Sequence, residues 1–259
     1  MSGRIHPSAV VHRGAQLADD VEVGPYSVIG EHVEVGAGSW IGSSVVLDGH
    51  LRIGQRNRIF HFASVGGPPQ DKKYKGEPTR VEIGDDNTIR EYVTINRGTT
   101  QDTGVTRLGN DNWIMAYVHF AHDVVVGNKT IFANCTQLAG HVIVEDWVIF
   151  GATTLVHQYV RIGAHAFTGM GSFVSQDVPP YVMAAGGMAR PFGINGEGLR
   201  RRGFSEETIQ ELKRAYRTLY RSGLSLEAAK QELESQAERC QEVKPILEFL
   251  QISKRGIIR

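Results

Sequence analysis

Apolar residues recur at every sixth position through most of this 259-residue chain. The series runs from Ile5 to Val65, resumes from Ile83 to Ile95, and continues after a one-residue slip from Leu108 to Val174, and only Thr168 in it is not apolar. Neither the period of an α-helix nor the alternation of a simple strand gives this spacing. A hexapeptide repeat does. The sequence therefore predicts an all-β solenoid over most of its length.

Each six-residue unit is interpreted as a short strand followed by a turn. Its first position points inward, and its fifth position is usually small or β-branched, as at Ser27, Ala63 and Thr136. Three units close one triangular coil of about 18 residues, and successive coils stack about 4.8 Å apart. Glycine often follows the inward residue, where a tight corner favours backbone freedom. Such repeats suit a parallel β-helix, and a scaffold without chemistry would satisfy the same pattern.

Composition excludes several functional classes. Formal charge is balanced, with 28 basic and 28 acidic residues, so no global field indicates nucleic acid or a membrane surface. No apolar run of about 18 residues predicts a membrane span, and the first residues do not resemble a signal peptide. Cys135 and Cys240 lie far apart, which favours a reducing compartment without disulfides. We expect a cytoplasmic protein.

Two domains are predicted, a β-helix over residues 1–190 and a helical domain over 191–259. Ser205 is expected to cap one helix that stops near Gly223, Ser225 to open a second, and a third to begin near Pro245. Residues 200–221 carry an excess of basic side chains. This excess indicates either a solvated helix face or a docking surface for an acidic partner or phosphate.

Two loops interrupt the repeat, at about 66–82 and about 97–107. Because a regular solenoid has smooth walls, these loops are expected to help build a cleft.

Histidines gather in the coils that follow the loops. With about 18 residues per coil, His141 should lie above Asp123, and Gly140 above His122, with His157 and Gln158 on the same edge. Two chemistries could use this cluster. Three imidazoles can hold zinc with an open water position. Alternatively, one imidazole can deprotonate a hydroxyl near neutral pH while a carboxylate fixes its tautomer. Because Cys135 falls elsewhere in the coil, direct transfer with a histidine base is favoured over a covalent enzyme intermediate, and no cofactor or metal is predicted.

Longer strings in the chain are more specific than the repeat. HFAHD (119–123), LAGHV (138–142), VHQY (156–159), QDKKYKGEPTRVEIGD (70–85), PPYV (179–182) and PFGINGEGLRRRGFS (191–205) resemble the acyl-[acyl carrier protein]–UDP-N-acetylglucosamine O-acyltransferase family. The resemblance covers essentially the whole chain. It implies a left-handed parallel β-helix with a C-terminal α-helical domain, assembled as a homotrimer with sites between subunits. It also implies transfer of a 3-hydroxyacyl group from acyl carrier protein to the 3-hydroxyl of UDP-N-acetylglucosamine, the first step of lipid A biosynthesis.

The resemblance also implies roles for individual residues. His122 would be the general base, Asp123 would orient it, and the N–H group of Gly140 would stabilise the oxyanion. The residues implied to line the sugar and the reacting groups are Asp71, Lys73, His119, His141 and His157. Those implied to bind the nucleotide and diphosphate end are Gln158, Asn195, Glu197, Arg201 and Arg202. Since acyl carrier protein is acidic, docking becomes the favoured interpretation of residues 200–221.

Three positions depart from the family pattern. Asn96 and Met188 stand where histidine is common, so neither is given a binding role. Met170 stands where the family carries glycine and where residue size limits acyl length. A methionine there predicts a donor of about ten rather than about fourteen carbons, because each buried methylene contributes roughly 0.8 kcal/mol. The alternative is that the flexible methionine moves aside.

Rival functions remain for the sequence alone. A zinc-dependent lyase resembling γ-class carbonic anhydrases needs three histidines on one ion. The N-acyltransferase that acts later in the same pathway usually carries an extra N-terminal domain. A non-catalytic trimeric scaffold is the third alternative.

Overall fold

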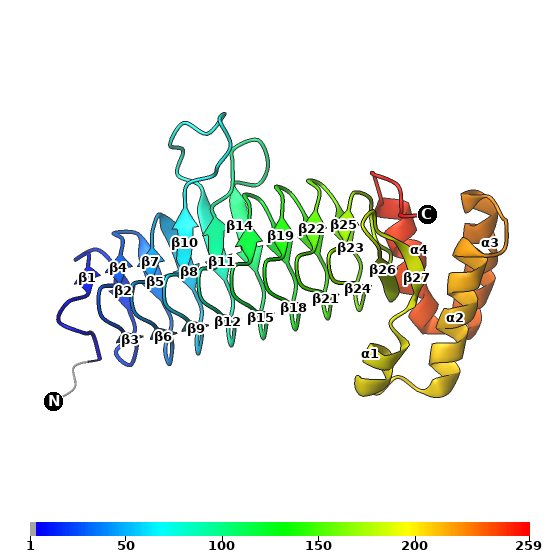
Figure 1. Cartoon of the computed structure of the whole chain (residues 1–259), viewed down its shortest axis with the longest axis horizontal. Coiled ribbons are helices and arrows are strands. Elements are labelled where there is room, and N and C mark those ends of the chain that lie inside the picture. The colour runs from blue at the N-terminus through cyan, green and yellow to red at the C-terminus, as the bar shows by residue number, and fades with distance from the viewer. Residues whose placement is uncertain (1–3) are drawn as a thin grey trace.

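A computed structural model describes residues 4–259. Figure 1 shows an elongated solenoid of parallel strands with helices gathered at its C-terminal end. The strands form three sheets, the three faces of a triangular prism. The first sheet has nine strands: β1 (Val10–Val11), β4 (Val28–Ile29), β7 (Val46–Leu47), β10 (Ser64–Gly67), β13 (Thr94–Asn96), β16 (His119–Phe120), β19 (Gln137–Leu138), β22 (Leu155–Val156) and β25 (Phe173–Val174).

The other two sheets follow the same stacking. The second has eight strands: β2 (Gln16–Leu17), β5 (Val33–Val35), β8 (His50–Ile53), β11 (Arg80–Ile83), β14 (Val105–Leu108), β17 (Val125–Val126), β20 (Ile143–Val144) and β23 (Arg161–Ile162). The third has ten: β3 (Glu22–Val23), β6 (Trp40–Ile41), β9 (Arg58–Ile59), β12 (Thr88–Ile89), β15 (Trp113–Ile114), β18 (Ile131–Phe132), β21 (Ile149–Phe150), β24 (Phe167–Thr168), β26 (Val182–Ala185) and β27 (Arg190–Ile194).

The core of the prism consists of the residues of the six-residue series together with residues at the fifth position of the units, such as Val45 and Val148. Phe120, Phe132 and Phe150 are fully buried, and their rings pack with centroids 4.8 and 4.7 Å apart. Thr168, the polar exception, is also buried, and its hydroxyl hydrogen-bonds that of Thr154 at 2.9 Å. At the N-terminal end the packing weakens, since Ile5 is 43% exposed where no coil lies below it.

The glycines that follow the inward residues serve a purpose other than the one predicted. Apart from Gly66, they do not adopt left-handed backbone angles; that conformation falls on residues two positions later, such as Tyr26 and Ser44. A Cβ on Gly24 would instead lie 2.8 Å from the carbonyl carbon of Gly42 in the next coil. At such corners glycine is favoured because successive coils approach closely, not because the corner needs backbone freedom.

The two loops leave the prism on the same side (Figure 1) and are shorter than the sequence suggests. β10 extends to Gly67 and β11 begins at Arg80, so the first loop covers 68–79. The second covers 97–104, because Val105 already pairs with Arg80 in the second sheet. Arg97 joins the loops: its Nε donates to the Tyr74 hydroxyl at 3.0 Å, and its Nη1 donates to the Gly66 carbonyl at 2.9 Å.

The chain was expected to become helical after Pro191, but it first forms another strand. β27 contains this proline and pairs antiparallel with β26. A short helix, α1 (Gly196–Arg201), follows; it was not predicted, since of its six residues only Leu199 is buried. The later helices, with the short 3₁₀ turn η1, are α2 (Glu206–Tyr220), α3 (Leu226–Arg239), η1 (Gln241–Val243) and α4 (Lys244–Ile252). Ser205 and Ser225 cap α2 and α3, as predicted.

The end of the chain returns to the last coil. Ile258 donates its N–H group to the Asp177 carbonyl at 2.9 Å, and Asp177 donates to the Gly256 carbonyl at 3.0 Å. Ile258 is buried in the solenoid core. The helical domain is thus joined to the prism at β27 and again at residues 256–258. None of the helices within residues 4–259 combines the length and the apolar character that a bilayer crossing needs.

Candidate active site

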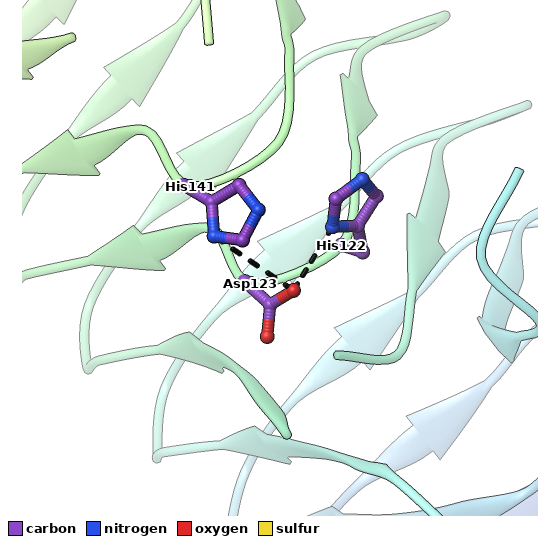
Figure 2. Close-up of side chains that lie close together, drawn as sticks. All are labelled: His122, Asp123 and His141. Carbon is purple, nitrogen blue, oxygen red and sulfur yellow. Dashed lines mark hydrogen bonds and ion pairs between the residues drawn. The ribbon is translucent and has the colours of Figure 1, made fainter. Parts of the chain in front are cut away.

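Four residues form what we call the histidine corner, where the chain turns from the first sheet to the second: His122, Asp123, Gly140 and His141. β16 pairs with β19 so that Phe120 lies beside Leu138, which places His141 above Asp123 and Gly140 above His122, as predicted. Asp123 and His141 both adopt left-handed backbone angles, with φ of 58° and 62°. A non-glycine residue adopts this conformation at a cost of order 1 kcal/mol. The repeated corner imposes it here and directs both side chains to one place (Figure 2).

The carboxylate of Asp123 is the centre of this corner. Its side chain is fully buried, and its Oδ2 lies 2.9 Å from Nδ1 of His122. Thr99, in the second loop, donates its hydroxyl to Oδ2 at 2.6 Å and its N–H group to both carboxylate oxygens at 3.0 Å. Burial opposes ionisation, but the hydrogen bonds from His122 and Thr99 outweigh it and hold the pKa of Asp123 below its usual range. Asp123 is therefore an ionised acceptor at neutral pH.

The hydrogen bond to Asp123 determines the tautomer of His122. Because a carboxylate only accepts, Nδ1 of His122 carries a proton, and Nε2 is left as an acceptor. The His122 side chain is 17% exposed, so its ring is accessible from solvent. A Cβ on Gly140 would lie 2.8 Å from this Nε2, so only glycine leaves room for the ring. Within residues 4–259 the Gly140 N–H group has no hydrogen-bond partner.

His141 has a carboxylate of its own. Its Nδ1 lies 2.8 Å from Oδ2 of Asp102 and 3.9 Å from Oδ2 of Asp123. Its ring stacks on Tyr159, with centroids 4.4 Å apart and planes 5° apart, and meets the His122 ring edge-on at 5.0 Å.

A metal could use part of this corner. One ligand atom from each of His122, Asp123 and His141 lies within 4.8 Å of the others. Among residues 4–259 this group contains two imidazoles rather than the three of the zinc alternative. Both imidazoles also engage carboxylates through Nδ1. The arrangement fits proton transfer more closely than an open zinc site.

Other predicted residues lie around the corner. His119, in β16, accepts or donates a hydrogen bond with the Thr94 hydroxyl at 2.7 Å, and burial together with nearby His122 lowers its pKa. His157 and Gln158 follow β22 on the next coil of the same edge, where Nδ1 of His157 lies 3.1 Å from the Gln158 carbonyl. Within residues 4–259, no hydrogen bond or ring contact joins His157 to His122 or His141.

Asp71 and Lys73 lie in the first loop and contact each other locally. The Lys73 N–H group donates to Oδ1 of Asp71 at 2.9 Å. Neither side chain contacts the histidine corner through any hydrogen bond or ion pair within residues 4–259.

The remaining predicted binding residues lie on another face. A cavity of about 560 Å³ adjoins the outer side of the third sheet under α1. Its lining includes Asn195, Glu197, Arg201 and Arg202, together with Lys129 and Trp147. Asn195 caps α1, accepting from the Gly198 N–H group at 3.2 Å and donating to the His165 carbonyl at 3.0 Å. Arg201 pairs with Glu197 at 3.0 Å.

Arg202 sits among aromatic rings beside this cavity. Its guanidinium lies 5.1 Å from the Trp147 ring centroid, and its Nη1 lies 3.1 Å from Nδ1 of His165. His165 stacks between Trp147 and Tyr181. Burial and then the Arg202 charge lower the pKa of His165 to about 4, so its ring is neutral at pH 7 and accepts from Arg202. The side chains form a cationic, aromatic-walled recess.

The three unusual positions differ in environment. Met170 is 79% exposed and lies at the corner between the third and first sheets, not at the histidine corner. Met188 is 58% exposed beside Phe173. Asn96 is 9% exposed at the end of β13, and its Oδ1 is buried without a partner within residues 4–259.

Sequence reasoning missed several residues of these two places. Thr99 and Asp102 reach the histidine corner from the second loop, and the six-residue repeat does not determine the conformation of this loop. Lys129, Trp147 and His165 lie on the corner between the second and third sheets, one coil apart from each other. The coil arithmetic that stacks His141 on Asp123 would also have stacked these three, so a signal for them was present.

Comparisons with known proteins agree with this architecture. A family model described as domain 2 of UDP N-acetylglucosamine O-acyltransferase matches residues 177–258, and one for bacterial transferase hexapeptides matches residues 106–140. An acyl-[acyl-carrier-protein]–UDP-N-acetylglucosamine O-acyltransferase of Thiobacillus denitrificans is 60% identical over 98% of this chain and 99% of its own. A protein of the same name from a Janthinobacterium strain is also 60% identical, over 98% and 99%.

A solved structure extends the likeness to three dimensions. The UDP-N-acetylglucosamine O-acyltransferase (LpxA) of Moraxella catarrhalis superposes with a TM-score of 0.96 at 43% identity, covering 99% of this chain and all of the other. The solenoid is thus a left-handed parallel β-helix with a C-terminal helical region, as predicted. These matches extend over nearly the full length of this chain and of the proteins it matches. The chain belongs to the acyl-[acyl-carrier-protein]–UDP-N-acetylglucosamine O-acyltransferases and is an acyltransferase.

Proposed function

We propose that this enzyme transfers a 3-hydroxyacyl group from acyl carrier protein to the 3-hydroxyl of UDP-N-acetylglucosamine, the first step of lipid A biosynthesis. The names of its relatives support the two substrates. One observation carries the mechanism: His122 donates Nδ1–H to a buried, ionised Asp123 and keeps Nε2 as an acceptor at a partly exposed corner.

The proton moves through His122 in both halves of the reaction. Nε2 takes the proton of the sugar hydroxyl as that oxygen attacks the thioester carbonyl. A C–O bond forms, the carbonyl becomes an oxyanion, and the C–S bond then breaks. The protonated imidazole returns the proton to the departing sulfur, so the base is restored. Asp123 holds the ring in the required tautomer and stabilises its transient positive charge.

Gly140 serves the oxyanion. Its N–H group has no partner within residues 4–259 and lies on the coil directly above His122. A free backbone donor next to the base can stabilise the developing charge, a contribution of about 3 kcal/mol in comparable sites.

The complete site requires more than one copy of the chain. The histidine corner joins the first and second sheets, whereas the recess of Asn195, Glu197, Arg201 and Arg202 adjoins the third. Asp71 and Lys73 contact neither place within residues 4–259. In a homotrimer, the histidine corner of one subunit lies opposite a different face of the neighbouring subunit. The sugar then lies against His119, His141, His157, Asp71 and Lys73, and the nucleotide and diphosphate end against Gln158 and the cationic recess.

The acidic carrier protein docks on α2. Within residues 4–259, Arg200, Arg201 and Arg214 pair with carboxylates of this chain, while Lys213, Arg217 and Arg221 have no such partner. These three cations supply the excess charge that an acidic surface would neutralise.

Met170 limits the acyl chain to about ten carbons, since its side chain takes the room that a glycine would leave for the chain end. Both cysteines are free thiols, which supports a cytoplasmic enzyme.

The test replaces His122 by glutamine, with His32→Gln as the matched control on a distant coil. Purified protein is incubated with UDP-N-acetylglucosamine and 3-hydroxyacyl carrier proteins of several lengths, and products are read by mass. We expect His122→Gln to lose at least about 10²-fold in rate, since general-base catalysis contributes about 10²–10⁴-fold. His32→Gln should keep the rate. A folded His122→Gln enzyme with full activity would refute the mechanism, and a requirement for stoichiometric zinc would favour the metal alternative.

A further inference from the structure

The two imidazoles of the histidine corner each engage a separate carboxylate. Asp123 accepts from His122 at 2.9 Å, and Asp102 lies 2.8 Å from Nδ1 of His141. The 3.9 Å between His141 Nδ1 and Asp123 is too long for a hydrogen bond (Figure 2). The pairing is therefore one carboxylate to one ring.

This pairing matters because Oδ2 of Asp123, the oxygen nearest to His141, already accepts several hydrogen bonds. This oxygen receives His122 Nδ1–H and the Thr99 hydroxyl, and the carboxylate receives the Thr99 N–H group. Were His141 to turn its Nδ1–H toward Asp123, it would compete with the base for the same oxygen. Asp102 provides an alternative acceptor and keeps the two rings apart.

Asp102 also determines which nitrogen of His141 faces the site. Since a carboxylate only accepts, the 2.8 Å contact requires a proton on Nδ1 and leaves Nε2 as an acceptor. Tyr159, stacked at 4.4 Å, fixes the plane of the ring but not its tautomer. The His141 side chain is only 9% exposed, so water has little access to its ring as an alternative hydrogen-bond partner.

We propose that Asp102 is a positioning residue for the acyl transfer, holding His141 with Nε2 free to accept a hydrogen bond from the sugar. Asp102 itself, at 44% side-chain exposure, does not touch the reacting atoms but acts through His141. The second loop is therefore part of the site, since Thr99 contacts Asp123 and Asp102 contacts His141. The role of His141 toward the sugar rests on the proposed function.

The experiment compares Asp102→Ala and Asp102→Asn, with Gln101→Ala as the control in the same loop. We expect kcat/KM for UDP-N-acetylglucosamine to fall about tenfold in Asp102→Ala, mostly through KM, the loss that accompanies one hydrogen bond to a charged group. Asp102→Asn should stay within about threefold, because its amide oxygen still accepts from Nδ1–H. In a His141→Gln background Asp102→Ala should add no further loss. A full tenfold loss in that background would overturn the proposal.

A second readout does not depend on turnover. Imidazole nitrogen NMR of histidine-labelled protein, assigned with His141→Gln, should show a protonated Nδ1 and an unprotonated Nε2 at His141 in the unmodified enzyme. Asp102→Ala should shift these signals and Asp102→Asn should retain them. Unchanged His141 signals in Asp102→Ala would refute the role of Asp102. If the unmodified enzyme failed to acylate UDP-N-acetylglucosamine, the proposed function would fall, and the NMR result would still decide the role of Asp102.

Discussion

Replacing Gly140 by alanine tests whether the His122 ring must stand where the structure places it. The new methyl carbon would lie 2.6 Å from Cε1 and 2.8 Å from Nε2 of His122. Real Cβ contacts of this length do not occur, so the ring or the backbone must move. Rotating the ring breaks the 2.9 Å hydrogen bond to Asp123. A hydrogen bond to a charged group contributes about 1.5–3 kcal/mol, which corresponds to a loss of roughly 10- to 150-fold in rate.

The assay is the initial rate of acyl transfer at saturating donor and acceptor. Gly187→Ala is the matched control, since no atom lies within 4 Å of a Cβ at that position. Thermal unfolding and the oligomeric state of both variants separate a local displacement from a folding defect. A Gly140→Ala enzyme that is folded and keeps the unmodified kcat would show that neither the ring position nor this corner of the backbone matters for catalysis.

Two further changes probe other parts of the molecule. Met170→Gly should move the preferred donor from about ten toward about fourteen carbons, each added methylene being favoured by roughly fourfold, whereas Met170→Leu should retain the shorter donor; equal preferences in all three proteins would contradict the length limit. His165→Phe should reduce the pH dependence of stability. The folded-state pKa of about 4 lies below the unfolded value of 6.5, so between these values only the unfolded chain takes up the proton, and the free energy of unfolding falls as pH drops from 6.5 toward 4. After allowance for solvent screening we expect about 1–2 kcal/mol less stability at pH 5 than at pH 7 from this group, measured by denaturant titration. An identical loss in His165→Phe would rule out His165 as the source.

The coil arithmetic predicted the part of the site that the repeat itself determines. Asp123 and His141 are stacked because Phe120 pairs with Leu138, and nothing interrupts the chain between them. The arithmetic fails where loops intervene, since Ser64 pairs with Thr94 and Thr94 with His119. For that reason the contacts of Thr99 and Asp102 with the corner were not foreseen.

The helical region shows a different limit. Ser205 and Ser225 allowed α2 and α3 to be predicted. Each serine hydroxyl accepts from the N–H group three residues later in the chain, and this capping pattern is a local signal. β27 and α1 were harder to predict. Pro191 is tolerated because it lies in the terminal strand of the sheet, and α1 has a capping residue, Asn195, but only Leu199 to bury. Both depend on packing against the prism, which a window of sequence does not contain.

The double attachment of the helical domain bears on how the enzyme can move. β27 pairs with β26 on one side, and Ile258 and Ser253 hydrogen-bond Asp177 on the other, so the helices cannot swing about a single hinge. The walls of the Arg202 recess come partly from the prism and partly from α1 and its two capping residues, so the double attachment holds these walls in a fixed relation. If the nucleotide end binds in this recess, as proposed above, the double attachment predicts that it binds without a hinge closure of the helical domain.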